Sequence, residues 1–153
     1  MDNIDKKILK IISEDASTPS IEISNAVGLS LPATNKRIAK LRSEGIIRTQ
    51  TIVTDPKRVD KPIAAFLLIV MKYGEHISEF LSSIKEDRDI LECYAVTGEY
   101  DYLLKIYASS VEDLEQKLIK IKRQKGVLKS HTMLALEEHK FSAAVLPDDE
   151  VVA

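Results

Sequence analysis

The stretch from Gly98 to Asp101 carries more chemical groups than a turn needs. It reads Gly-Glu-Tyr-Asp and lies between two runs of strand composition, ILECYA before it and YLLKIYA after it. A two-residue hairpin turn requires only a pair such as Asn-Gly or Asp-Gly. The extra carboxylates and the aromatic ring could therefore belong to a binding site. On their own, however, these residues favour solvated turn acids.

A second group of residues gives one helix a cationic face. At about 100° per residue, Lys36, Arg37 and Lys40 fall on one side of a helix, opposite an apolar side. Residues 34–58 hold seven basic side chains and two acidic ones. The alternative, an ordinary solvated helix surface, is disfavoured by the spacing of the neighbouring helices. We predict contacts with double-stranded DNA from Ser30, Pro32, Ala33, Thr34, Lys36, Arg37, Lys40 and Arg48.

Three short helices must position that cationic face. Asp2 can cap the first helix, Ser20 the second and Ser30 the third, and apolar residues recur at helical spacing within the first two. Gly28 can end the second helix, because glycine readily adopts the left-handed geometry of a helix C-terminus. The run GIIRTQTIV, residues 45–53, is typical of a strand. This order predicts a winged helix-turn-helix.

The pattern changes at Ile63, where strand-like and helical runs begin to alternate. The order is β-α-β-β-α-β, which predicts a ferredoxin-like domain and makes the whole chain α+β. Both helices of such a domain cover the same face of the sheet. The first strand is apolar on both sides, so we expect its uncovered face to associate with a second copy.

Composition bounds the remaining possibilities. Charged residues make up 30% of the chain, and no run of 18 apolar residues or signal-peptide pattern occurs. Cys93 is the single cysteine, and the three histidines lack metal-ligand spacing on one element. We therefore expect a soluble, cytoplasmic protein that is not an enzyme, has no metal or other cofactor and contacts no membrane.

The predicted elements divide the chain into four parts. We expect a helix-turn-helix domain over residues 1–50 and a connecting strand and linker over 51–62. An effector-binding and oligomerisation domain follows over residues 63–138, and an acidic tail over 139–153 ends the chain.

Two segments in this order resemble one protein family. DNIDKKILKIISEDAS, IEISNAVGLS and KRIAKLRSEGII resemble the N-terminal domain of the Lrp/AsnC regulators. VTGEYDYLLKIYASSVEDLEQ resembles the central motif of that family's RAM domain, which regulates amino-acid metabolism. HTMLALEEHK resembles the final strand of archaeal members, so the resemblance covers nearly the whole chain.

The resemblance implies a transcription regulator that binds DNA, forms homodimers through the RAM sheet and assembles further, commonly to octamers. It also implies a small effector, usually an amino acid, held between dimers. The family's effector motif corresponds to Gly98, Glu99, Tyr100 and Asp101, and the last strand contributes His131, Thr132 and Met133. Glu99 stands where Asp is more usual. Asp101 or Glu99 would pair with the effector's ammonium, and backbone N–H groups of the turn would meet its carboxylate.

Two other functions remain as alternatives. A DNA-organising protein that responds to no effector would keep the cationic helix and the dimer. A siroheme-decarboxylase-like enzyme would share both modules but would not need a cationic third helix, so that helix argues against it.

Overall fold

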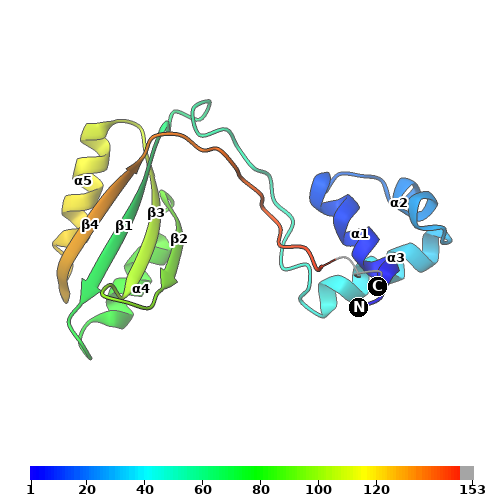
Figure 1. Cartoon of the computed structure of the whole chain (residues 1–153), viewed down its shortest axis with the longest axis horizontal. Helices are drawn as coiled ribbons and strands as arrows, with labels where there is room; N and C mark the ends of the chain where they lie inside the picture. The colour runs from blue at the N-terminus through cyan, green and yellow to red at the C-terminus, as the bar shows by residue number, and fades with distance from the viewer. Residues whose placement is uncertain (149–153) are drawn as a thin grey trace. The chain divides into compact units, whose positions relative to one another are not determined.

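The computed structural model describes residues 1–148 and contains two compact units (Figure 1). The first unit comprises Met1–Ile52 together with residues 140–148, and the second comprises Val53–His139.

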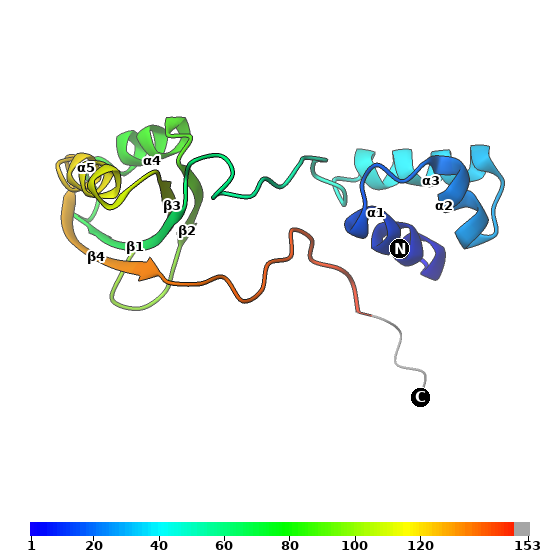
Figure 2. The same cartoon turned by 90° about the horizontal axis from the view of Figure 1, so that it is seen from above.

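Three helices make up the first unit: α1 (Asn3–Glu14), α2 (Ser20–Val27) and α3 (Leu31–Ser43). Figure 2 shows α3 lying across the other two helices. Asp2 caps α1 as predicted, because its carboxylate accepts the backbone N–H of Asp5 at 2.9 Å. One apolar cluster holds the helices together, with Ile8 and Ile23 at its centre.

The connection between α2 and α3 is a three-residue turn, as in a helix-turn-helix. Gly28 ends α2 with φ at 68°, a left-handed conformation that side chains with a Cβ rarely adopt. Ser30 then caps α3, accepting the N–H of Ala33 at 3.4 Å. The predicted cap at Ser20 is wrong, because the N-cap of α2 is Pro19 and Ser20 is already helical.

The strand predicted over residues 45–53 is not formed. Among the described residues the single sheet lies in the second unit. Backbone N–H groups attach the start of this segment to α3, from Gly45 to the Arg42 carbonyl and from Ile47 to the Leu41 carbonyl, each at 3.0 Å. A strand is held by the ladder of hydrogen bonds to a neighbour, and this segment has no neighbouring strand. Ile47 packs against the three-helix core, whereas Ile46, Ile52 and Val53 remain exposed, Ile52 by 82%.

The tail was predicted to be acidic over residues 139–153. Residues 139–148 form no helix or strand, and the Lys6 ammonium donates to the Asp148 carbonyl at 2.8 Å. Asp149 and Glu150, two of its acids, lie outside the described residues.

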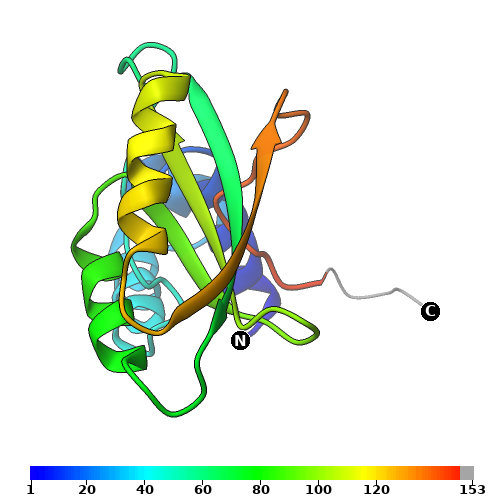
Figure 3. The ribbon, with the colours of Figure 1, turned by 90° about the vertical axis from the view of Figure 1, so that its left-hand side faces the viewer.

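The second unit is a four-stranded antiparallel sheet with two helices, in the predicted ferredoxin-like order. The strands lie in the order β2-β3-β1-β4, and Figure 3 shows both helices on one face. The elements are β1 (Ile63–Met71), α4 (Ile77–Glu86), β2 (Ile90–Ala95), β3 (Tyr102–Ala108), α5 (Val111–Lys122) and β4 (Val127–Ala135).

The two faces of this sheet differ sharply in burial. Alternate residues of β1, such as Leu67 and Ile69, are fully buried against the helices, where Phe80 fills the core. Phe66 and Leu68 point to the other face, which neither α4 nor α5 covers. The register places Leu103, Tyr94, His131 and Met133 on the same uncovered face. This apolar surface is the predicted site of self-association.

Candidate DNA-binding and effector-binding sites

The outer side of α3 offers two exposed lysines. Lys36 is exposed and has no carboxylate partner among the described residues, and the Lys40 side chain is 68% exposed with only a 3.7 Å contact to Glu44. A hollow of about 570 Å³ lies beside them, bounded on its other side by Met1 and Asp2. Both ammonium groups can therefore approach phosphates without breaking a strong ion pair.

Arg37 does not share this freedom. Its Nη1 lies 2.6 Å from Asp2 Oδ2 and 2.8 Å from Asp5 Oδ1, so α3 is fastened to the first turn of α1. The hydrogen bond that Arg37 donates to Asp5, followed by the one it donates to Asp2, raises the pKa of the Arg37 guanidinium. The pKa of Asp2 is lowered, chiefly by the N–H of Asp5 and then by Arg37. The expected phosphate contact of Arg37 stays a prediction, and the structure adds that this side chain holds two helices together.

We expect Arg37→Gln to lower the melting temperature of the first unit. The slope of log DNA affinity against log salt should change by less than the amount that one phosphate contact contributes. Because the folded-state pKa of Asp2 lies below its ordinary 3.8, its contribution to stability is complete above that value. The contribution is lost as the pH falls through the lower folded-state pKa. The difference in melting temperature between variant and wild type should therefore be constant near neutral pH and become smaller below about pH 4.

Thermal melts across this pH range, with Lys40→Gln as control, test whether Arg37 joins the two helices. A salt slope reduced as much by Arg37→Gln as by Lys40→Gln would contradict it.

The first turn of α3 presents a mixed surface. Ser30 and Pro32 are exposed and Ala33 is half-buried, so all three remain available to DNA. Thr34 is fully buried, and its hydroxyl donates to the Ser30 carbonyl at 3.1 Å. Its predicted DNA contact is corrected, since the position belongs to the inward face of the helix. Arg48 is exposed, after the end of α3.

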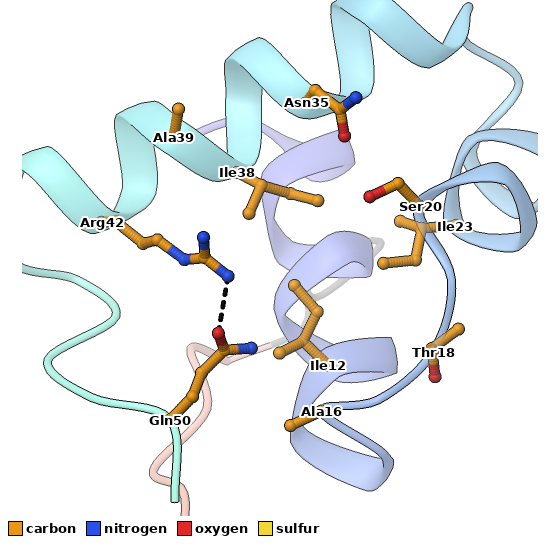
Figure 4. A pocket seen from close by; sticks show the side chains of 10 residues that line it. All are labelled: Ile12, Ala16, Thr18, Ser20, Ile23, Asn35, Ile38, Ala39, Arg42 and Gln50. Carbon is orange, nitrogen blue, oxygen red and sulfur yellow. Dashed lines mark hydrogen bonds between the residues drawn. The ribbon is translucent and has the colours of Figure 1, made fainter.

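Arg42 lies at the edge of the inward side of α3 and is itself exposed. Figure 4 shows its guanidinium reaching over a cavity of about 280 Å³ whose lining includes Ile12 and Ile38. Arg42 Nη2 lies 2.6 Å from Gln50 Oε1. Arg42 thus ties the segment after α3 back to the helix.

The turn between β2 and β3 is built around Gly98, whose φ is 106°. Asp101 fastens the turn to β1 through two groups. Its N–H donates to the Ile69 carbonyl at 2.8 Å, and its Oδ2 accepts the N–H of Met71 at 2.7 Å. One carboxylate oxygen of Asp101 is therefore occupied within the chain, which the sequence did not indicate, and Oδ1 is left for a ligand.

Residues 97–100 leave their backbone N–H groups available. Within the described part of the chain none of these four groups donates a hydrogen bond. Glu99 is exposed and likewise makes no bond there. Consecutive free N–H groups around a glycine turn can receive a carboxylate.

The last strand brings part of the predicted effector set to this turn. The rings of Tyr100 and His131 lie 6.4 Å apart between centroids, and Lys129 Nζ lies 5.2 Å from the Tyr100 centroid. Met133 shares the face of His131 but lies farther along the strand. Thr132 pairs with the buried Leu67, so it points to the helix-covered face, and its predicted place in the site is corrected.

Sequence reasoning did not place Lys129 beside the turn. The signal was available, because Lys129 lies two residues before His131 and a strand places alternate residues on one face.

Two further searches covered the described residues. Across residues 1–148 no group of three or more His, Cys, Asp or Glu could hold a metal ion. No helix in that range is long and apolar enough to span a membrane.

Comparison with known proteins identifies both units. Residues 1–48 match the winged helix-turn-helix DNA-binding family, and residues 64–145 match the Lrp/AsnC ligand binding domain. The chain belongs to the Lrp/AsnC family. The predicted identification and α+β fold are thereby confirmed. This Lrp/AsnC chain is a DNA-binding transcription regulator with a ligand-binding domain.

Named relatives extend the comparison. The chain is 39% identical to the HTH-type transcriptional regulator FL11 of Pyrococcus horikoshii, over 92% of each protein. An AsnC family regulator of Agrobacterium tumefaciens has a similar structure, with a TM-score of 0.88 and 25% identity, over 95% of this chain and 96% of that one. A regulator of Neisseria meningitidis, solved as a complex with L-Met, has a TM-score of 0.90 and 26% identity over the same shares.

Proposed function

We propose that this Lrp/AsnC protein is a cytoplasmic regulator that binds specific double-stranded DNA sequences and responds to an amino acid. Homodimers form through the uncovered face of the sheet and assemble further, to octamers. The amino acid binds between dimers at the Gly98–Asp101 turn. Lys36 and Lys40 contact DNA phosphates, while Ser30, Pro32 and Ala33 lie at the base edges or backbone.

The observation that carries the effector proposal is the position of the Gly98 turn beside the uncovered face. Tyr100 of the turn contacts His131, and His131 pairs with Leu68 on that face. An effector bound at the turn would therefore lie at the margin of a surface suited to contact other copies. The L-Met complex of the Neisseria regulator shows that a structurally similar protein binds an amino acid.

Regulation then follows from linkage. An effector alters the populations of two assemblies only by binding one of them more tightly. The assembly determines the spacing of the helix-turn-helix units, and that spacing determines which paired half-sites can be bound. The ligand-binding domain can thus control DNA occupancy without touching DNA.

Selection of bound duplexes from random sequence, performed with and without a mixture of amino acids, tests the proposal. We expect a two-fold symmetric site whose enrichment or half-site spacing changes when amino acids are present. Unselective recovery of duplexes would contradict sequence-specific binding. A symmetric site that is the same in both arms would contradict effector control and favour the effector-independent organiser.

A further inference from the structure

The end of the sheet beside the Gly98 turn belongs to a strongly basic part of the second unit. Residues 116–136 contain six Lys and Arg side chains and no Asp or Glu. Lys117 is neutralised by Asp89 and Asp113 at 2.8 Å, and Lys120 lies 3.5 Å from Asp87. Lys129 has no carboxylate within ion-pair distance of its ammonium among the described residues, and unlike Lys122, Arg123 and Lys125, which also lack one there, it lies over the ring of Tyr100 in the turn.

Lys129 is held at the effector turn by strand register. It pairs with Val70 of β1, which places it on the uncovered face two residues before His131. Its ammonium lies 5.2 Å from the centroid of the Tyr100 ring, within the range of a cation–π contact. The ring thus holds the cation at the turn without neutralising it.

The acids of the same turn do not neutralise Lys129 either. Asp101 directs one oxygen to the N–H of Met71, and the Glu99 carboxylate is exposed. The turn therefore presents separate anionic and cationic groups, together with the free N–H groups of residues 97–100. A ligand that satisfies all of them needs one positive group and two negative ones.

We propose that the effector is an acidic amino acid, with Lys129 as the residue that selects its side-chain carboxylate. This inference rests on the proposed amino-acid site at the turn. The ammonium of the ligand pairs with Asp101 Oδ1 or Glu99, and its α-carboxylate meets the turn N–H groups. Lys129 then remains for the second carboxylate, in a charge-assisted hydrogen bond that an amide or apolar side chain cannot match.

Calorimetric titration of the full-length protein with glutamate, glutamine, lysine and methionine tests the inference. Glutamate and glutamine have nearly the same shape, so their comparison isolates the charge. We expect glutamate to bind at least about tenfold more tightly than glutamine, the ratio expected for one charge-assisted bond. Equal affinities, or a preference for glutamine, lysine or methionine, would overturn the acidic effector while leaving an amino-acid site in place. No binding of any of these four would overturn the acidic effector, and no binding of any of the twenty amino acids, titrated in the same way, would overturn the proposed function as well.

Three substitutions at Lys129 locate the selectivity. Lys129→Met should reduce glutamate affinity to the level of glutamine, whereas Lys129→Arg should keep the preference. Lys129→Glu should reverse it, so that lysine binds more tightly than glutamate. Lys122→Met, which removes an exposed charge from α5 in the same basic stretch, is the matched control and should keep the wild-type preference.

Sedimentation velocity checks that each variant assembles as the wild type does. Loss of glutamine and glutamate binding in equal proportion in Lys129→Met would assign Lys129 to the α-carboxylate and overturn the inference.

Discussion

Replacing Lys36 and Lys40 together by glutamine should weaken binding to the selected duplex about a hundredfold at 0.1 M salt. Each lysine that neutralises a phosphate releases a condensed counterion, which contributes about 0.9 to the slope of log affinity against log salt. The double variant should therefore lose about 1.8 from that slope. Both side chains are exposed, so the fold and its melting temperature should be unaffected. Fluorescence anisotropy between 50 and 200 mM salt measures affinity and slope together.

A control for total charge is needed, because any lost cation weakens attraction to a polyanion. Lys85→Gln with Lys122→Gln removes the same two charges from the second unit, at exposed positions on α4 and α5. We expect this control to keep the wild-type slope. If both double variants lose the same slope, α3 does not provide the specific phosphate contacts.

Replacing Phe66 by aspartate should raise the dissociation constant of the homodimer by about a thousandfold or more. Phe66 points to the uncovered face between Lys105 and Met133, and it is partly exposed in the single chain. A second copy covering this face would bury the introduced carboxylate without a dedicated partner, which costs several kcal/mol. The affinity for a duplex with two half-sites should fall as the dimer is lost, because each half-site would then be bound independently. Analytical ultracentrifugation across a concentration series gives the constant.

Val111→Asp serves as the comparison for Phe66→Asp. Val111 is 61% exposed at the first position of α5, on the helix-covered side of the sheet, where an acid is tolerated near the helix N-terminus. Its dimer should be unchanged. A Phe66→Asp protein that remains folded and dimeric would show that association uses another surface.

The fold could be predicted because its determinants are local. Gly28 and Ser30 mark the turn between α2 and α3, and Ile8 lies in an apolar repeat that only a helix aligns. The alternation of strand and helix runs after Ile63 fixed the topology in the same way. The failed strand over residues 45–53 marks the limit of local signals, since strand composition says nothing about whether a partner is present.

The sites were less predictable because their geometry depends on distant pairs. Arg37 belongs to a cationic helix face by spacing, yet its partners Asp2 and Asp5 lie 35 and 32 residues earlier. The predicted DNA contact of Thr34 is wrong, because the helical spacing that exposes Lys36 also turns Thr34 inward. Strand alternation separates Thr132 from His131 for the same geometric reason. Helical and strand periods assign side chains to faces, but only the three-dimensional structure shows which charges are already satisfied.

The Asp101 carboxylate accepts a backbone N–H that would otherwise bond to a carbonyl of a neighbouring strand. It receives the N–H of Met71 where the pairing of β1 with β4 shifts register, between Val70 and Met71. A ligand that displaced this oxygen would leave the N–H of Met71 without an acceptor, which is unfavourable. Ligand binding at the turn is therefore coupled to the conformation of β1 at Met71. If the proposed effector binds this turn, the exchange of this single hydrogen bond would link its binding to the surface on which neighbouring copies are proposed to meet.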